Sequence, residues 1–247
     1  MKKFLLMLFI VATTAAFGQG KTLFVVNVAT PKGGQGTAFE AAWKLHLAKF
    51  HNTTDKRTVY QILSGRRNGS FLLIQGPVSF ADMDIELPNA KEHRLDLEKT
   101  IVPREEPGVT NEYYRWADTL SYKPDVQAEK YLVTVTHVKN GRMADYLTEV
   151  RRAQMINTKS NPPISYSNYV QIWAGSDPVI VNVRNLKDGF KELDAAYGTP
   201  MTPGGMKDAY VQEYGQAAWD TRMKNGVDDV TSREVYIMKV RKDLSSK

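Results

Sequence analysis

The sequence of 247 residues contains no cysteine. Disulfide bonds, thiolate metal sites, iron–sulfur clusters and thiol catalysis are therefore excluded, and stability must come from packing. Histidine is scarce as well: the chain has four, at positions 46, 51, 93 and 137. None has the H-x-x-x-H or H-E-x-x-H spacing that is typical of metal sites. The sequence therefore predicts no metal centre.

Beyond its first residues, the chain has no apolar run long enough to span a membrane. The start combines Lys2 and Lys3 with an apolar segment from Phe4 to Phe17, followed by Gly18. This pattern is typical of a signal peptide, so we expect residues 1–18 to be removed; an uncleaved anchor is the alternative. We expect an exported protein, periplasmic or extracellular, with no stable membrane insertion after cleavage.

A strong excess of basic residues is also missing. The formal charge is +6, and it falls to +4 when the two lysines of the expected leader are removed. The densest basic spots are the pairs at 66–67 and 151–152, and neither extends into the stripe that nucleic-acid binding requires. Nucleic acid is therefore not an expected partner.

Two stretches that lie 110 residues apart share a pattern. VYQILSG at 59–65 and YVQIWAG at 169–175 carry Gln, Ile and Gly at the same places. The likeness in chemistry and spacing continues over roughly sixty positions, which indicates an internal repeat. Each copy predicts a strand, a helix, a hairpin, a second helix and a last strand. The expected first strands are 23–29 and 132–138, and the expected last strands are 112–120 and 234–241.

The order β-α-β-β-α-β is the ferredoxin-like split motif, in which both helices cover one face of an antiparallel sheet. We expect an α+β fold with a first repeat at 19–122, a linker at 123–128 and a second repeat at 129–247. The second repeat carries an inserted amphipathic helix near 207–224. In the first repeat, Thr37 and Glu40 predict a capping box for the first helix. Each sheet leaves one face open, so we expect the two copies to pair as a fused α+β barrel.

The two element sets resemble the dimeric α+β barrel superfamily, which includes antibiotic-biosynthesis-monooxygenase-like proteins. The most characteristic piece is VKNGRMADYL at 138–147. The resemblance covers nearly the whole mature chain and includes no catalytic motif. It implies a small-molecule pocket, in some relatives with cofactor-free oxygenation. Relatives also include haem-handling proteins, so haem stays open beside our expectation of no cofactor. Both a monomer and a homodimer are compatible with it.

Side-chain alternation selects residues for the barrel interior. It places Val59, Gln61 and Leu63 between the sheets, opposite Tyr169, Gln171 and Trp173. The two glutamines are then either ligand-orienting groups or a hydrogen-bonded pair that fixes packing. The resemblance adds the first helix to the pocket. The predicted ligand-binding residues are Trp43, His46, Gln61, Tyr169, Gln171 and Trp173, and no catalytic residue is identified.

These expectations combine into one function. The protein is expected to bind a small apolar or aromatic molecule in a barrel pocket, with cofactor-free oxidation as an option. The alternative is a non-catalytic binding or protein-interaction module whose barrel is filled. The sequence alone leaves open the ligand and whether the protein is an enzyme.

Overall fold

The structure is a computed structural model that describes residues 20–53, 55–86, 88–108, 111–173, 177–196 and 203–246. The predicted leader, residues 1–18, lies outside them. Eight strands occur in the described residues: β1 (Leu23–Ala29), β2 (Arg57–Ile62), β3 (Phe71–Val78), β4 (Asn111–Trp116), β5 (Lys130–Val138), β6 (Tyr166–Ile172), β7 (Val179–Leu186) and β8 (Val230–Val240).

The helices connect these strands. They are α2 (Gly36–Phe50), α3 (Phe80–Met83), α4 (Ala90–Asp96), α5 (Met143–Ser160), α6 (Lys191–Ala196), α7 (Pro203–Tyr214) and α8 (Gln216–Asp228). A π-helical turn, η2 (Leu97–Ile101), continues α4, and two 3-10 turns follow, η3 (Val102–Arg104) and η4 (Asp118–Leu120).

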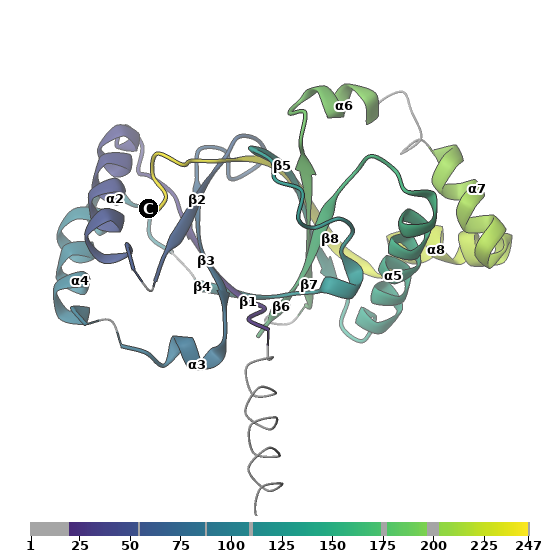
Figure 1. The fold of residues 1–247 in the computed structure, drawn as a ribbon, viewed down its shortest axis with the longest axis horizontal. Helices are drawn as coiled ribbons and strands as arrows, with labels where there is room; N and C mark the ends of the chain where they lie inside the picture. The colour runs from purple at the N-terminus through teal and green to yellow at the C-terminus, as the bar shows by residue number, and fades with distance from the viewer. Residues whose placement is uncertain are drawn as a thin grey trace, which may run out of the picture.

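The strands close into one antiparallel barrel in the order β1-β3-β2-β8-β5-β7-β6-β4. The strand order within the first half is β4-β1-β3-β2, and the order within the second half is β8-β5-β7-β6. The halves meet at two seams, where β2 pairs with β8 and β4 pairs with β6. Figure 1 shows the ring of strands with α2 and α4 on one side and α5, α7 and α8 on the other. The predicted α+β fold with a barrel is confirmed, and one chain closes the barrel by itself.

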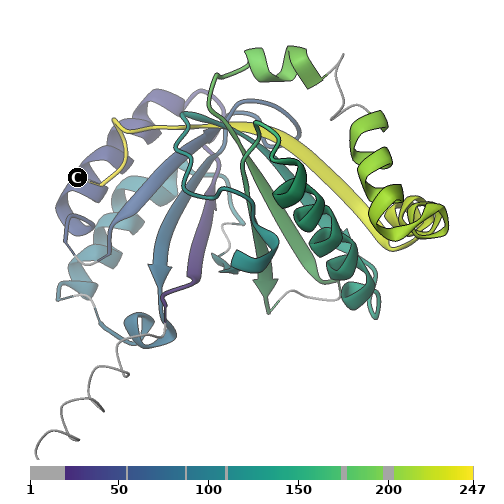
Figure 2. The ribbon, with the colours of Figure 1, turned by 45° about the vertical axis from the view of Figure 1, so that its right-hand side comes forward.

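Both faces of the first-half strands are covered. Successive side chains of a strand point alternately into the barrel and towards the helices. On the interior side a cluster joins the two halves, and it includes Ile62, Leu72, Val133, Val181 and Tyr236. On the outer side a second cluster packs α2 against the sheet, and it includes Phe39, Leu47, Val59, Phe71 and Leu73. Figure 2 shows the helices as an outer layer around the strands.

Local details differ from the sequence expectations. Helix α2 begins after Gln35 with no side-chain cap, so the predicted capping box of Thr37 and Glu40 is wrong. The structure has a capping box at α3 instead, between Ser79 and Asp82. The helix expected near 207–224 is two helices, α7 and α8. They are separated at Gly215, whose φ of 86° favours glycine and ends the first helix.

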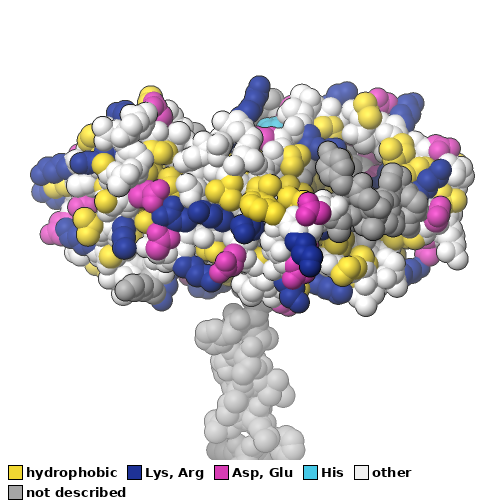
Figure 3. Space-filling model, turned by 90° about the horizontal axis from the view of Figure 1, so that it is seen from above, with side chains coloured by type: hydrophobic (Ala, Val, Ile, Leu, Met, Phe, Trp, Pro, Cys, Tyr) yellow, Lys and Arg dark blue, Asp and Glu magenta, His cyan; other side chains and the backbone are white. Residues whose placement is uncertain are grey.

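The surface carries mixed charge. Figure 3 shows Lys and Arg side chains interspersed with Asp and Glu over one face, beside a central group of apolar side chains. Within the described part of the chain, no helix combines the length and apolarity needed to cross a membrane.

Candidate functional site

A cavity of about 360 Å³ lies inside the barrel. This volume falls within the range of roughly 300–1,000 Å³ that is typical of small-molecule pockets. Its apolar and aromatic wall comes from strands of both halves and includes Phe24, Val26, Tyr60, Leu72, Ile74, Tyr131, Val133, Tyr169 and Met238. The segment before β5 lines it as well, and Asn185 Nδ2 of β7 donates to the carbonyl oxygen of Val126 in that segment at 2.8 Å.

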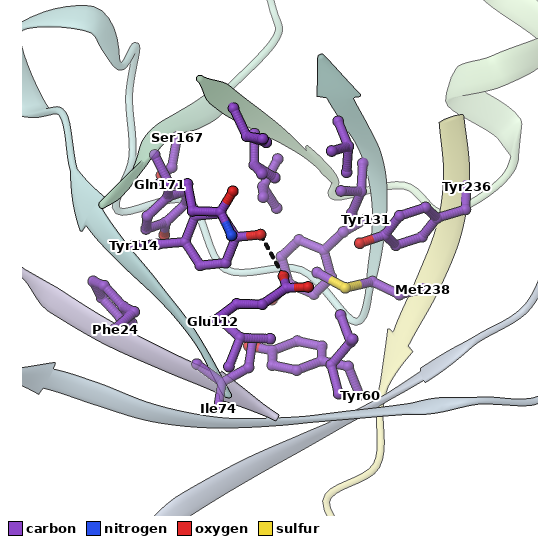
Figure 4. Close-up of a pocket in the computed structure, with 18 of the residues that line it drawn as sticks. Phe24, Tyr60, Ile74, Glu112, Tyr114, Tyr131, Ser167, Gln171, Tyr236 and Met238 are labelled. Carbon is purple, nitrogen blue, oxygen red and sulfur yellow. Dashed lines mark hydrogen bonds between the residues drawn. The ribbon is translucent and has the colours of Figure 1, made fainter. Parts of the chain in front are cut away.

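A carboxylate group projects from this aromatic wall into the cavity. Glu112 of β4 points into the cavity, and Tyr114 Oη donates a hydrogen bond to its Oε2 at 2.6 Å, as Figure 4 shows. The two residues lie two positions apart on one strand, which places both side chains on the interior face. Burial raises the pKa of Tyr114 well above its ordinary value, and the neighbouring Glu112 charge adds to the shift. The tyrosine therefore keeps its proton and remains a donor to the carboxylate.

Other tyrosines supply hydroxyl groups to the same space. Burial raises the pKa of Tyr236 to about 12, and it raises the pKa of Tyr60 further. The ring of Tyr60 meets Tyr131 edge-on at 5.6 Å between centroids. Arg67, which follows β2, also lines the cavity, and its Nε lies 3.9 Å from Glu234 Oε2. The cavity thus combines flat apolar walls with protonated hydroxyl donors and one carboxylate.

The structure places two of the six predicted ligand-binding residues in this cavity, Tyr169 and Gln171. Gln61 lies on the opposite face of β2, where its Oε1 accepts a hydrogen bond from Arg241 Nη1 at 3.1 Å. The expected placement of Gln61 inside the barrel, beside Gln171, is therefore wrong. Trp173 is 71% exposed on the outer surface, where its ring contacts Phe80 and Tyr113.

The error on β2 has a simple cause in the strand register. Tyr60 pairs with Leu72 in the first half, and Tyr169 pairs with Val181 in the second. All four residues line the cavity, and the two pairs lie 109 positions apart along the chain instead of 110. A slip of one residue moves every side chain of a strand to its other face. Val59 and Gln61 consequently face the helices.

Sequence reasoning also missed Glu112 and Tyr114. The signal was present, because Glu112, Tyr114 and Trp116 alternate with Tyr113 and Arg115 along one strand. A charged residue at an interior position of a strand is unusual and marks a candidate functional group.

Trp43 and His46 lie outside the barrel, on α2. Trp43 packs against the apolar cluster around Phe39 and Leu47, and His46 is 1% exposed. His46 does not line the cavity; it meets His51 and His93 instead. His46 Nε2 lies 3.1 Å from His93 Nε2, and His51 Nε2 lies 3.0 Å from the same atom.

The spacing of the histidines along the sequence did not predict that three of them meet in space. His51 follows His46 by five residues, a separation that a continuous helix would place on different sides. His51 is the residue after α2, and its non-helical backbone, with φ −120° and ψ 35°, turns its ring back towards His46. His93 comes from α4, more than forty residues away. Burial is the main cause that lowers the pKa of His93, to about 4, and the two neighbouring histidines add to it.

A second cavity, of about 1180 Å³, lies between the second-half strands and their helices. Its wall contains many polar side chains. They include Thr134, Thr136, Asn157, Asn168, Asn182, Arg184 and Arg233. Asn182 Nδ2 donates to Asn168 Oδ1 at 2.9 Å across the wall, and Asn168 Nδ2 donates to the carbonyl oxygen of Leu120 at 2.6 Å.

No protein-family model matches the sequence, and no curated protein sequence matches it. Solved structures resemble the fold. An anthrone oxidase-like protein superposes with a TM-score of 0.57 at 13% identity, covering 90% of this chain and 92% of that chain. A candidate monooxygenase from Lactobacillus acidophilus NCFM gives a TM-score of 0.54 at 10% identity, covering 92% and 97%. A mutant chlorite dismutase from Candidatus Nitrospira defluvii gives 0.50 at 5% identity, covering 90% and 93%.

These solved structures are α+β barrels of the dimeric type, and likeness at such low identity shows the fold alone. Haem can be tested against the side chains that are present. The barrel cavity includes His137 but offers about 360 Å³, at the small end for even drug-sized ligands. The larger cavity has neither histidine nor cysteine among the described residues of its wall. Neither cavity fits a histidine-ligated haem.

Proposed function

We propose that the protein binds a small, flat aromatic molecule in the barrel cavity and oxidises it, with Glu112 as the proton acceptor. The observation that carries this proposal is the Glu112 carboxylate, which stands among aromatic side chains and is held by Tyr114 at 2.6 Å. The anthrone oxidase-like and monooxygenase-like fold neighbours support oxidative chemistry as the reaction class.

The residues of the cavity suit the first step of such a reaction. A ligand with an acidic C–H or phenolic O–H loses that proton to the Glu112 carboxylate, while Tyr114 keeps donating to Oε2. The Tyr236 hydroxyl keeps its own proton, because its pKa is about 12, and it can donate to the oxygen on which negative charge develops. The apolar and aromatic side chains of the wall would limit the water beside the anion.

Molecular oxygen is the oxidant that this reaction requires. For anthrone the overall change is anthrone plus O2 to anthraquinone plus water. The proton taken by Glu112 leaves with the water, and the electrons of the anion reduce the oxygen. Anthrone is therefore a suitable probe, because it is flat, largely apolar and acidic at one carbon.

The test compares Glu112→Gln with the wild-type mature chain. Oxygen uptake and anthraquinone formation should both fall by about 10²–10⁴-fold, the usual contribution of a general base. Glu129→Gln is the matched control, because Glu129 is exposed and pairs with Lys242 on the surface; its rates should stay at the wild-type level. Equal rates for Glu112→Gln and wild type would contradict the assigned role.

The non-catalytic alternative is separated by a binding measurement. Val26 lines the cavity, and Val26→Phe should fill part of it. If anthrone binds wild type but not Val26→Phe, and no oxidation occurs, the protein is a binding module. If anthrone binds neither, the cavity does not take this class of ligand. Added haem should produce no shifted Soret band in either protein.

We further propose that the protein is exported and that its halves are a tandem repeat. The leader pattern at 1–18 supports export. Mass spectrometry of the mature protein should then give a chain that starts near Gln19. The shared strand order of the two halves supports a duplication, with repeats at 19–122 and 129–247.

A further inference from the structure

Three histidines on the outer face of the first half form a compact group, here termed the histidine cluster: His46, His51 and His93. One ring nitrogen of each lies within 4.8 Å of the other two. Both short contacts involve Nε2 of His93, at 3.1 Å from His46 Nε2 and 3.0 Å from His51 Nε2. Helix α2 and the residue after it provide two rings, and α4, which lies beside α2 in Figure 1, provides the third.

The other ring nitrogens fix where the protons are. His46 Nδ1 lies 2.7 Å from Asp96 Oδ2. His51 Nδ1 lies 2.9 Å from Asp55 Oδ2 and 3.0 Å from the Asp55 carbonyl oxygen. These oxygens accept hydrogen bonds, so Nδ1 carries the proton in both rings, and each Nε2 presents a lone pair. A neutral His93 has a single N–H to share between two acceptors.

Hydrogen bonding alone therefore leaves this group poorly satisfied. If His93 Nε2 is protonated, one hydrogen must serve both neighbouring nitrogens. If it is not, its lone pair faces the lone pairs of His46 and His51 at 3.1 and 3.0 Å. Buried polar atoms in such a position are costly, and His46 and His51 are 1% and 3% exposed. A cation between the three nitrogens would satisfy all of them.

We infer that the histidine cluster is a binding site for a divalent transition metal, with Zn²⁺ as the occupant. Three imidazoles with an open fourth position form a common zinc ligand set. Zinc–nitrogen bonds of about 2.0–2.1 Å in a tetrahedron place the nitrogens about 3.3–3.4 Å apart, which is within about 0.4 Å of the two short contacts.

The surroundings match those of known zinc histidines. Ligating histidines usually donate their second N–H to a carboxylate or carbonyl oxygen, which orients the ring and increases its basicity. Asp96 and Asp55 hold His46 and His51 in this way. Thr100 Oγ1 in turn donates to Asp96 Oδ2 at 3.3 Å, and Arg57 pairs with Asp55. The carboxylates are thus themselves positioned.

A metal ion can reach the cluster from solvent, and its binding would affect the structure. His93 is only half-buried, so the third ligand faces solvent and leaves the fourth position for water. Because His46 and His51 belong to α2 and His93 to α4, a bound metal would tie the two helices together. None of the three histidines lines the barrel cavity, so this site is independent of the proposed oxidation.

The test uses the mature chain, dialysed against a chelator and then titrated with Zn²⁺ by calorimetry. One Zn²⁺ per chain is expected, and its binding should raise the melting temperature. His93→Gln should weaken binding by more than about 100-fold, beyond what loss of an orienting partner costs. His137→Gln is the matched control, because the fourth histidine lies outside the cluster, and it should bind as wild type does.

Asp96→Asn provides a second variant in case His93→Gln does not fold. As a positioning residue, Asp96 should affect affinity by about 10–100-fold while the stoichiometry stays at one. Co²⁺ gives an independent readout, since tetrahedral nitrogen ligation produces visible absorption that His93→Gln should abolish. Wild-type protein that takes up no Zn²⁺, or uptake that survives His93→Gln, would overturn the site.

Discussion

The two halves of the barrel share a strand order, yet the spaces under their helices are opposite in character. In the first half, apolar residues of the strands and of α2 pack into a cluster, with Leu47 and Leu73 1% and 2% exposed. In the second half, the strands and α5 border an open cavity of about 1180 Å³ whose wall mixes polar and apolar side chains. One ladder position explains much of the contrast: Val59 pairs with Leu73 in the first half, and Asn168 pairs with Asn182 in the second.

This difference shows what topology does and does not determine. The strand order places helices on the outside of both halves. The side chains that the strands direct towards the helices decide whether the space between strands and helices is a packed core or a cavity. Burial of valine and leucine side chains away from water stabilises the folded state. A buried amide pair, in contrast, needs a hydrogen-bond partner for each of its donors and acceptors. The barrel cavity and the outer cavity of the second half are therefore separate features of one barrel.

The largest expected effect contrasts the two outer faces directly. Leu73→Ala should lower the free energy of unfolding by about 2–5 kcal/mol, because it opens a hole in a packed cluster. Val150→Ala in α5 should cost less than about 1 kcal/mol, because Val150 borders an existing cavity. Urea denaturation of the two variants measures both values. Equal losses would mean that the second face is as tightly packed as the first.

The fold was largely predictable because strand and helix signals are local. The first strand is found at its expected residues, Leu23–Ala29, and the order of strands and helices in each half follows the expected pattern. The interior face of β2 was not predictable. Strands covered on both sides carry apolar residues on both faces, so alternation in Arg57–Ile62 does not distinguish inside from outside.

The site was predictable only in part, for similar reasons. The predicted interior placement of Tyr169 and Gln171 is correct, because the alternation along β6 follows the expected phase at these two residues. The histidine cluster depends on how α4 packs against α2 and on a non-helical residue at the end of α2. No local pattern encodes contacts between residues more than forty positions apart. Glu112 was not predicted, because the sequence alone does not show which face of β4 points into the barrel.

The intermediate effect tests the asparagine pair on the outer face of the second half. Asn168 is 2% exposed, and its side chain bonds both the Leu120 carbonyl oxygen and Asn182. Asn168→Ala leaves the carbonyl oxygen without its donor, so the free energy of unfolding should fall by roughly 1–3 kcal/mol. Val59→Ala at the corresponding first-half position is the matched comparison. An unchanged midpoint for Asn168→Ala would show that water in the cavity replaces the lost bonds.

The smallest effect concerns a local feature that both halves share, the start of the second helix in each. Asp82 Oδ2 accepts from Ser79 N at 2.7 Å, and Glu192 Oε1 accepts from Asp188 N at 2.9 Å. The hydrogen bonds from Ser79, aided by Lys21, lower the pKa of Asp82 from 3.8 to about 2. The charged form is therefore favoured by folding. Its stabilisation is complete above about pH 4 and is lost as the pH falls through about 2.

Asp82→Asn should consequently destabilise the protein slightly at pH 7, and the difference from wild type should shrink as the pH approaches 2. Thermal unfolding at a series of pH values measures this, with Asp84→Asn as the control that removes an equal charge from the end of α3. Glu192→Gln should also lower the melting temperature at pH 7. A difference between Asp82→Asn and wild type that stays constant down to pH 2 would show that the cap does not act through its charge. The two helix starts would then share a hydrogen-bond geometry without sharing a stabilising charge.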